Sequence, residues 1–487
     1  MSIQAVDAQR AYDTIIVGNG SIGLSLGLVL ARRGLAVAVV GKSSRPFAAS
    51  AAAGAMNGCF GEATPGLLRS EHGRAKLAMD VRATGMWDAW EQSLVEESDE
   101  TAIRTANGTV VILNTIGIPE IDSAGYASIR AALEEYKEPY EDLDPADIPW
   151  LNPEPGSRPL RAMFIPGERA VNTIALLRGL GTAFTRAKGT LVDEHASGLQ
   201  ISGGKVTGVT FASGQTLSAP TVVLAAGAAS YDLLAGLPEE SRDLIPAMVC
   251  GYGIALLIGT TDGTVPDSVI RTPNRAFACG LHVVPRGEGR IYLGATNNIS
   301  PQPRDSGKVG DLNLLLGCTR QLRTDLVEAA VERIMVGNRP VPLDGFPLIG
   351  ELSAVGVSGL WMMTGTYRDG LHQSPLLAHE MGARILGEPH DKELDVFTPV
   401  RPPIQAMSRE ECLKTAVQHT LALGFEQDWD LPMEWPPIIE EQLERWYTEL
   451  MDQFDSQFTP PPELLAYGED DINDQLKKYY AAYKDSV

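Results

Sequence analysis

Apolar positions at the start of the chain form two short runs with a patterned segment between them. Residues 14–17 and 35–40 are almost entirely apolar, which is typical of buried strands. Residues 24–34 place apolar side chains at helical spacing, and Gly34 is suited to end a helix there. The order strand, helix, strand predicts the first unit of a parallel sheet.

Three glycines connect the first strand to this helix. Gly18, Gly20 and Gly23 have the spacing G-x-G-x-x-G. In this spacing the first glycine allows a tight turn, the second allows a pyrophosphate to approach the backbone, and the third allows the helix to pack on the strand. The pyrophosphate would lie at the positive end of the helix, beside Ser21 and Ile22. We therefore predict a dinucleotide site here.

The end of the second strand leaves the type of dinucleotide open. An acidic residue at this point usually holds a ribose hydroxyl, but this chain has Gly41, followed by Lys42 and Ser43. The positive charges of Lys42 and Arg45 would suit the 2′-phosphate of NADP. Ser43 or Ser44 is a candidate for the missing ribose contact.

The remaining pattern alternates between two kinds of segment. A helix is expected at about 74–98, another is expected to open at 168–172 and run to Gly181, and residues 222–226 read as a buried strand that ends in glycine. Residues 250–300 alternate apolar and polar positions, which favours an antiparallel sheet. The sequence thus predicts two interleaved domains.

Two motifs in the last third identify a family resemblance. Residues 337–350 read GNRPVPLDGFPLIG, and residues 364–375 read TGTYRDGLHQSP. Together with segments 50–54, 222–227 and 284–296, they resemble the ordered motifs of the D-amino-acid oxidase and glycine oxidase superfamily of FAD enzymes. The resemblance covers residues 12 to about 390 and favours FAD over NADP, as does Gly27, four residues past Gly23.

This resemblance implies an α/β fold, in which a Rossmann-type FAD-binding domain is interleaved with an antiparallel-sheet substrate domain and followed by a helical C-terminal extension. The expected FAD-binding parts are 1–100, 161–245 and 336–395. The substrate parts are 101–160 and 246–335, and the acidic extension is 396–487. The extension is rich in aromatic residues and proline, so we expect helices packed on the main body, with an oligomer contact or an active-site cover as alternatives.

The resemblance also implies which residues contact the cofactor. Since no histidine or cysteine matches an attachment position, FAD is expected to be non-covalent. The backbone amides of Gly370 and Leu371 would stabilise negative charge on the flavin ring. The full set of expected contacts is Gly18, Gly20, Ser21, Ile22, Gly23, Lys42, Ser43, Ser50, Ala53, Gly54, Val171, Ala226, Gly227, Arg339, Gly370 and Leu371.

Oxidation of an amine to an imine needs orientation and a hydride acceptor, but no catalytic acid or base. The seven histidines accordingly form no Ser-His-Asp set and no pattern of metal ligands. Arginine is the residue best suited to hold a substrate carboxylate, and Arg339 and Arg368 occupy the two family positions. Arg368 is the preferred clamp; the alternative for either residue is bracing of a loop.

Three further side chains are candidates for the substrate pocket, namely Met56, Asn57 and His372. His282 is a catalytic candidate because relatives tend to carry a tyrosine near this position, although a structural histidine is an equal alternative. We expect an oxidase that converts a primary or secondary amine of an amino acid or related metabolite to an imine, with O2 forming hydrogen peroxide. The alternatives are an FAD dehydrogenase or NADPH-linked reductase, an amino-sugar oxidase, and a catalytically silent flavoprotein subunit.

Composition limits the other partners. The net charge of −22 disfavours nucleic acid, and no apolar stretch is long enough to predict a membrane span. The five cysteines form no C-x-x-C pair and no secretory leader is evident, so we expect a cytoplasmic protein. A homo-oligomer formed through the extension is a further expectation.

Overall fold

A computed structural model describes residues 11–484, and a six-stranded sheet forms the centre of its first domain. The strand order is β20-β21-β13-β1-β2-β9, and neighbouring strands are parallel except for β20 and β21. The bounds are β1 (Thr14–Val17), β2 (Val37–Val40), β9 (Thr190–Val192), β13 (Thr221–Leu224), β20 (Leu348–Glu351) and β21 (Leu360–Thr364).

Side chains of the central strand alternate between two apolar cores. Ile16 belongs to the core beneath the helices, whereas Ile15 and Val17 belong to the core on the opposite face. The helices are α1 (Ser21–Arg32), α4 (Glu71–Glu97), α6 (Thr173–Arg186) and α9 (Gly370–Ile385). The opposite face is covered by a three-stranded antiparallel sheet of β10 (Ala196–Ser202), β11 (Lys205–Phe211) and β12 (Thr216–Ser218).

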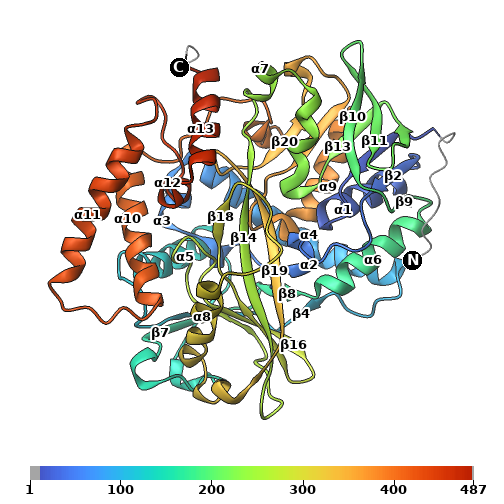
Figure 1. Cartoon of the computed structure of the whole chain (residues 1–487). Coiled ribbons are helices and arrows are strands. Elements are labelled where there is room, and N and C mark those ends of the chain that lie inside the picture. Colours follow the sequence, from blue (N-terminus) through green and yellow to red (C-terminus); the bar gives the residue numbers. More distant parts are fainter. Residues whose placement is uncertain (1–10, 485–487) are drawn as a thin grey trace.

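A larger sheet forms the second domain, and Figure 1 shows its long strands β14 and β19 running side by side. Its order is β18-β14-β17-β16-β15-β5-β7-β6, with β19 paired to β14; all pairs are antiparallel except β5 with β15. The bounds are β5 (Thr109–Leu113), β6 (Glu141–Leu143), β7 (Arg161–Ile165), β14 (Met248–Gly259), β15 (Val269–Arg271), β16 (His282–Gly287), β17 (Arg290–Gly294), β18 (Asn298–Ser300) and β19 (Ala330–Pro342).

Shorter elements connect these layers. A small sheet joins β3 (Met56–Asn57), β8 (Arg169–Val171) and β4 (Arg104–Thr105). The remaining helices of the main body are α2 (Ala49–Ala52), α3 (Pro65–Arg69), α5 (Asp122–Tyr136), α7 (Glu239–Arg242) and α8 (Val309–Cys318). Within residues 11–484 no helix is both long and apolar enough to cross a bilayer.

The C-terminal extension is helical and packs on the second domain beside β18 and β14 (Figure 1). It contains α10 (Arg409–Glu426), α11 (Trp435–Met451), α12 (Pro462–Tyr467) and α13 (Asp470–Ala482). Its aromatic residues form one apolar core with residues of the main body, among them Val249 and Val341. Pro436 and Pro437 lie in the first turn of α11, where a missing N–H costs nothing, so they begin this helix instead of breaking it.

The predicted fold class is confirmed, including the interleaving of the two domains and the helical extension. Two strands of the second sheet extend past the expected borders between the domains. β7 begins at Arg161 and β19 continues to Pro342, so both extend the second sheet beyond the expected substrate segments. The expected helix after residue 168 begins only at Thr173, because residues 169–171 pair with β3 and β4.

Candidate functional site

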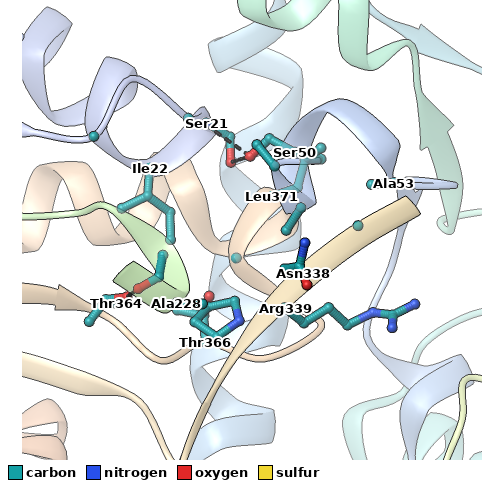
Figure 2. A pocket seen from close by; sticks show the side chains of 18 of the residues that line it. Ser21, Ile22, Ser50, Ala53, Ala228, Asn338, Arg339, Thr364, Thr366 and Leu371 are labelled. Carbon is teal, nitrogen blue, oxygen red and sulfur yellow. Dashed lines mark hydrogen bonds between the residues drawn. The ribbon is translucent and has the colours of Figure 1, made fainter. Parts of the chain in front are cut away.

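One large cavity joins the two domains. Its volume is about 750 Å³, within the range of small-molecule and cofactor sites. It begins at the carboxyl ends of β1 and β13 and reaches the second sheet at β16, β17 and β19. Figure 2 shows Ser21, Ser50 and Ile22 at one end of this space and Arg339 beyond them.

The glycine cradle at the first end is tightly packed. Gly18 has φ of +123°, and a Cβ there would lie 2.1 Å from the carbonyl oxygen of Ala225. A Cβ on Gly23 would lie 1.9 Å from the carbonyl oxygen of Gly18, so Gly23 holds the cradle from behind. Gly20 differs, because its added Cβ would meet only the Ser50 hydroxyl, at 3.2 Å, and Gly20 lines the cavity. A side chain on Gly20 would therefore occupy ligand space.

Two helices begin at the cavity wall. The N-terminus of α1, at Gly20 and Ser21, and that of α9, at Gly370, line the cavity, and no side chain of the capping residues bonds to either helix. The first amides of a helix have no partner within it, and the helix dipole makes this end attractive to negative charge. The α1 end fits a pyrophosphate, and the α9 end fits the electron-rich edge of a flavin.

Asn19 occupies the space where an acidic side chain was expected. A Cβ on Gly41 would lie 2.6 Å from the Asn19 amide, which donates to the carbonyl oxygen of Lys42 at 3.0 Å. The Asn19 oxygen is thus left as an acceptor at the cavity wall. Ser43 does not line the cavity: its backbone N–H donates to Asp193 at 2.7 Å and its hydroxyl donates to the same carboxylate at 3.2 Å.

Lys42 lines the cavity but is engaged elsewhere. Its ammonium donates to the carbonyl oxygen of Asp193 at 2.8 Å and lies 3.8 Å from Glu194. The positive charge that would suit a 2′-phosphate is thus partly neutralised. This arrangement makes Lys42 less suited to a 2′-phosphate contact, whereas Arg45 also lines the cavity.

Arg339 presents unused donors at the second end of the cavity. Its Nη1 bonds to the carbonyl oxygens of Gly251 and Thr296, both at 3.3 Å, and to Asn297 Oδ1 at 3.0 Å. Among residues 11–484, Nη2 and Nε have no hydrogen-bond acceptor. Figure 2 shows the side chain extended from β19. One edge of the guanidinium is therefore held by the protein, and the other is free for a ligand.

Arg368 is held in a similar way to Arg339, through one nitrogen of its guanidinium. Its Nη2 donates to the carbonyl oxygen of Phe277 at 2.7 Å and to the Tyr367 hydroxyl at 3.3 Å, and its Nη1 lies 3.9 Å from Glu62. Its buried Nε has no hydrogen-bond partner among residues 11–484. Both arginines therefore keep donors for a ligand, and the preference for Arg368 as the carboxylate clamp stays a prediction.

Glu62 is a wall residue that the sequence reasoning missed. Its oxygens accept from Arg271 Nη1 at 2.7 Å and from Asn274 Nδ2 at 2.9 Å. Burial raises the pKa of Glu62, but Arg271 and Arg368 outweigh this effect and bring it to about 2. Glu62 is therefore a fixed negative charge and not a proton acceptor near neutral pH.

His282 lines the cavity as predicted. Its Nδ1 lies 3.1 Å from the carbonyl oxygen of Gly280, so Nδ1 carries the proton, and its ring stacks on Tyr292 with centroids 5.7 Å apart. Burial lowers the pKa of His282 to about 3, and the positive charge of Arg271 adds to this. The ring is neutral near pH 7 and forms part of the wall.

The side chains of Asn57 and His372, both predicted for the substrate pocket, contact each other, and of the two His372 lines the cavity; their substrate-pocket role stays a prediction. Asn57 Nδ2 lies 3.0 Å from His372 Nδ1, and His372 Nε2 lies 2.8 Å from the carbonyl oxygen of Asp80. Both side chains are buried, and the contact of His372 with Asp80 connects α9 to α4. Met56 also lines the cavity.

Most of the other predicted positions come together at the cavity. Val171, Gly23, Ser43 and Asn57 lie outside its lining, because they support residues that form it. Asp369 lines the cavity but was not predicted; burial raises its pKa to about 6, against the effect of its buried ion pair with Lys76. The predicted residues that do line the cavity are Gly18, Gly20, Ser21, Ile22, Lys42, Ser50, Ala53, Gly54, Met56, Ala226, Gly227, His282, Arg339, Arg368, Gly370, Leu371 and His372.

Relatives of known sequence share most of the chain. The bifunctional protein ThiO/ThiG of Nostoc sp. is 28% identical over 388 residues, which is 79% of this chain and 54% of that protein. The glycine oxidase of Geobacillus kaustophilus is 27% identical over 372 residues, 75% of this chain and 90% of the relative. The chain thus spans about half the length of the bifunctional relatives that it matches.

Solved structures show the same fold. The glycine oxidase of Geobacillus kaustophilus superposes with a TM-score of 0.68 at 23% identity, covering 81% of this chain and 99% of the other. An iminodiacetate oxidase of Chelativorans sp. superposes with a TM-score of 0.66 at 20% identity, covering 79% of this chain and 98% of the other. A family model described as FAD dependent oxidoreductase matches residues 13–384. This chain therefore belongs to the FAD-dependent oxidoreductases of the DAO family.

Proposed function

We propose that the protein is an FAD-dependent oxidase of a small amine that carries a carboxylate. This proposal rests on what lies at the two ends of one cavity. A dinucleotide cradle lies at the first end, and the guanidinium of Arg339, with one edge left for a ligand, lies at the second. The names of the relatives, glycine oxidase and iminodiacetate oxidase, support a substrate of this class. Non-covalent FAD is part of the proposal.

In this proposal the protein supplies binding and orientation. FAD, when bound, supplies the hydride acceptor. Arg339 would hold the carboxylate through Nη2 and Nε, because a planar fork matches the two oxygens of that group. The substrate carbon loses a hydride and the nitrogen loses a proton, which gives the imine, and O2 takes up the two electrons as hydrogen peroxide.

The surrounding residues suit this chemistry. His282 is neutral, and Glu62 is held by Arg271, so neither of these two wall residues acts as an acid or base near neutral pH. The amides at the start of α9, Gly370 and Leu371, would stabilise negative charge that develops on the flavin edge. The amine must enter as a neutral species, and bulk solvent can take its proton before it binds.

The test is anaerobic reduction of the purified holoenzyme. We would mix it with glycine, sarcosine, iminodiacetate and D-alanine, and with amines that lack a carboxylate, and follow loss of the flavin absorbance. Reduction by at least one amino acid, with peroxide released when air is admitted, is the expected result. Reduction only by amino sugars or by NADPH would replace the proposal with one of those alternatives, and no reduction by any compound would favour a silent flavoprotein subunit.

Association through the extension stays a prediction. Several large apolar side chains of α11 and the preceding loop are exposed, including Met433 at 91%, Ile438 at 58% and Trp435 at 53%. Exposed apolar groups gathered on one element are typical of interaction surfaces. Light scattering of the full chain and of a variant with charged residues at Met433 and Ile438 measures whether copies associate here.

A further inference from the structure

A short loop before β16 separates the cavity from the C-terminal extension. In this loop, residues 273–281, Ala276 and Phe277 have φ of +47° and +58°. Non-glycine residues adopt this left-handed region only at a cost in free energy, so two in succession need partners that hold them. The partners of Phe277 lie on both sides of the loop.

Helix α10 holds the outer side of the loop. The Phe277 backbone N–H donates to His419 Nδ1 at 3.1 Å, and the two rings stack with centroids 4.5 Å apart and planes inclined by 19°. Two residues before Phe277, Arg275 is fully buried, and its Nε lies 3.5 Å from Oε1 of Glu426, the last residue of α10. The extension thus contacts the loop at two positions, Arg275 and Phe277.

The inner side of the loop supports both cavity arginines. The Phe277 carbonyl oxygen accepts from Arg368 Nη2 at 2.7 Å and from Asn297 Nδ2 at 2.9 Å. Asn297 Oδ1 in turn accepts from Arg339 Nη1 at 3.0 Å. A shift of Phe277 would therefore change the hydrogen bonds that orient both guanidinium groups.

Helix α12 reaches the same group of residues independently. The Tyr467 hydroxyl donates to the Asn297 carbonyl oxygen at 2.6 Å. Glu463 is hydrogen-bonded with Tyr367, whose hydroxyl also accepts from Asn297 Nδ2 at 2.5 Å. Both α10 and α12 therefore contact residues that bond to Arg339 or Arg368.

We propose that α10 and α12 belong to the substrate site, and that His419 and Tyr467 are positioning residues for Arg368 and Arg339. These helices lie outside the family match, which ends at residue 384. The structure thus assigns this chain a substrate site that is supported from outside by helices α10 and α12, which follow the family domain. Burial and the charge of Arg368 lower the pKa of His419 to about 3, so its Nδ1 is available as an acceptor across the neutral range.

The test compares matched tyrosine variants of the holoenzyme. Tyr467→Phe removes the hydroxyl that reaches Asn297, whereas Tyr447→Phe removes one that bonds to Thr420 within the extension, at 2.8 Å. His419→Phe keeps an aromatic ring against Phe277 but removes the acceptor, and His419→Gln restores one. Flavin content and melting temperature of each variant show whether it is folded.

The first readout is hydrogen–deuterium exchange of residues 273–281, which needs no substrate. We expect faster exchange in Tyr467→Phe and His419→Phe, but not in Tyr447→Phe, and partial recovery in His419→Gln. The second readout is binding of acetate, a simple carboxylate, followed by the flavin spectrum. Loss of one neutral hydrogen bond predicts a dissociation constant about two- to tenfold higher in the first two variants.

Only the acetate readout rests on the proposed function. If wild-type protein binds no carboxylate and no amine reduces it, the proposed function fails, whereas the exchange data still decide the inference. Equal exchange in the wild type, Tyr467→Phe and Tyr447→Phe would overturn it. Should His419→Phe not fold, Tyr467→Phe with its control decides alone.

Discussion

Replacement of Arg339 by lysine tests the geometry of the second end of the cavity. Arg339 Nη1 is held by three protein oxygens at 3.0 to 3.3 Å, and Nη2 and Nε are the donors left for a carboxylate. A lysine ammonium can occupy the position of Nη1 and keep the positive charge. It cannot supply the second and third donors, so the ligand loses the two-pronged contact.

The size of the effect follows from the bonds lost. A hydrogen bond to a charged group contributes about 1.5 to 3 kcal/mol. Since each 1.4 kcal/mol is a factor of ten, Arg339→Lys should raise the half-saturating concentration of a carboxylated amine by roughly 10 to 100 fold. The limiting rate of flavin reduction should change less, because the carboxylate is bound before and during hydride transfer.

Arg368→Lys is the matched control. Its Nη2 bonds to Phe277 and Tyr367, so its replacement should lower thermal stability, as should Arg339→Lys. Anaerobic stopped-flow reduction across amine concentrations gives the half-saturating concentration and the limiting rate of flavin reduction for each variant. Differential scanning fluorimetry gives the melting temperature. Unchanged half-saturation in Arg339→Lys, with a large rise in Arg368→Lys, would refute the assignment and return the clamp to Arg368.

Three further predictions address the cofactor and the wall. Gly20→Val should abolish flavin binding but leave the apoprotein folded. Gly18→Ala should lower the yield of folded protein, because its Cβ would clash with the backbone of Ala225. Flavin absorbance and apoprotein melting curves measure the two effects. Glu62 has its pKa lowered from 4.5 to about 2, mainly by Arg271 against the effect of burial, so it stabilises the fold above pH 4.5 and this contribution is lost as the pH falls toward 2. The stability advantage of wild type over Glu62→Gln should therefore shrink by about 2 kcal/mol between pH 7 and pH 3 in urea titrations; a constant difference would contradict the ion pair. Acid precipitation should release all the FAD, since burial raises the pKa of the cavity thiol Cys279 and disfavours a nucleophilic thiolate; colour in the pellet would show covalent attachment.

The sequence was sufficient for the elements whose residues are neighbours in the chain. The cradle could be predicted because a tight turn and a close helix each require glycine at a fixed offset, and the structure shows these contacts at Gly18 and Gly23. Strands and helices followed from apolar periodicity, and errors were confined to their ends, as at residues 169–171. That Arg339 and Arg368 lie at one cavity was predicted from the resemblance of their motifs to those of the family.

Only the tertiary structure decided how these residues are used. His372 pairs with Asn57, 315 positions away, and Glu62 pairs with Arg271, 209 positions away; no local pattern encodes either contact. The same holds for Asn19 beside Gly41, and for the contact of His419 with Phe277. Periodicity and motifs report the backbone conformation of one segment, whereas a side chain's partners depend on which segments pack together. The sequence therefore determined the fold and the cradle, and packing determined which donors of the two arginines are left for a ligand.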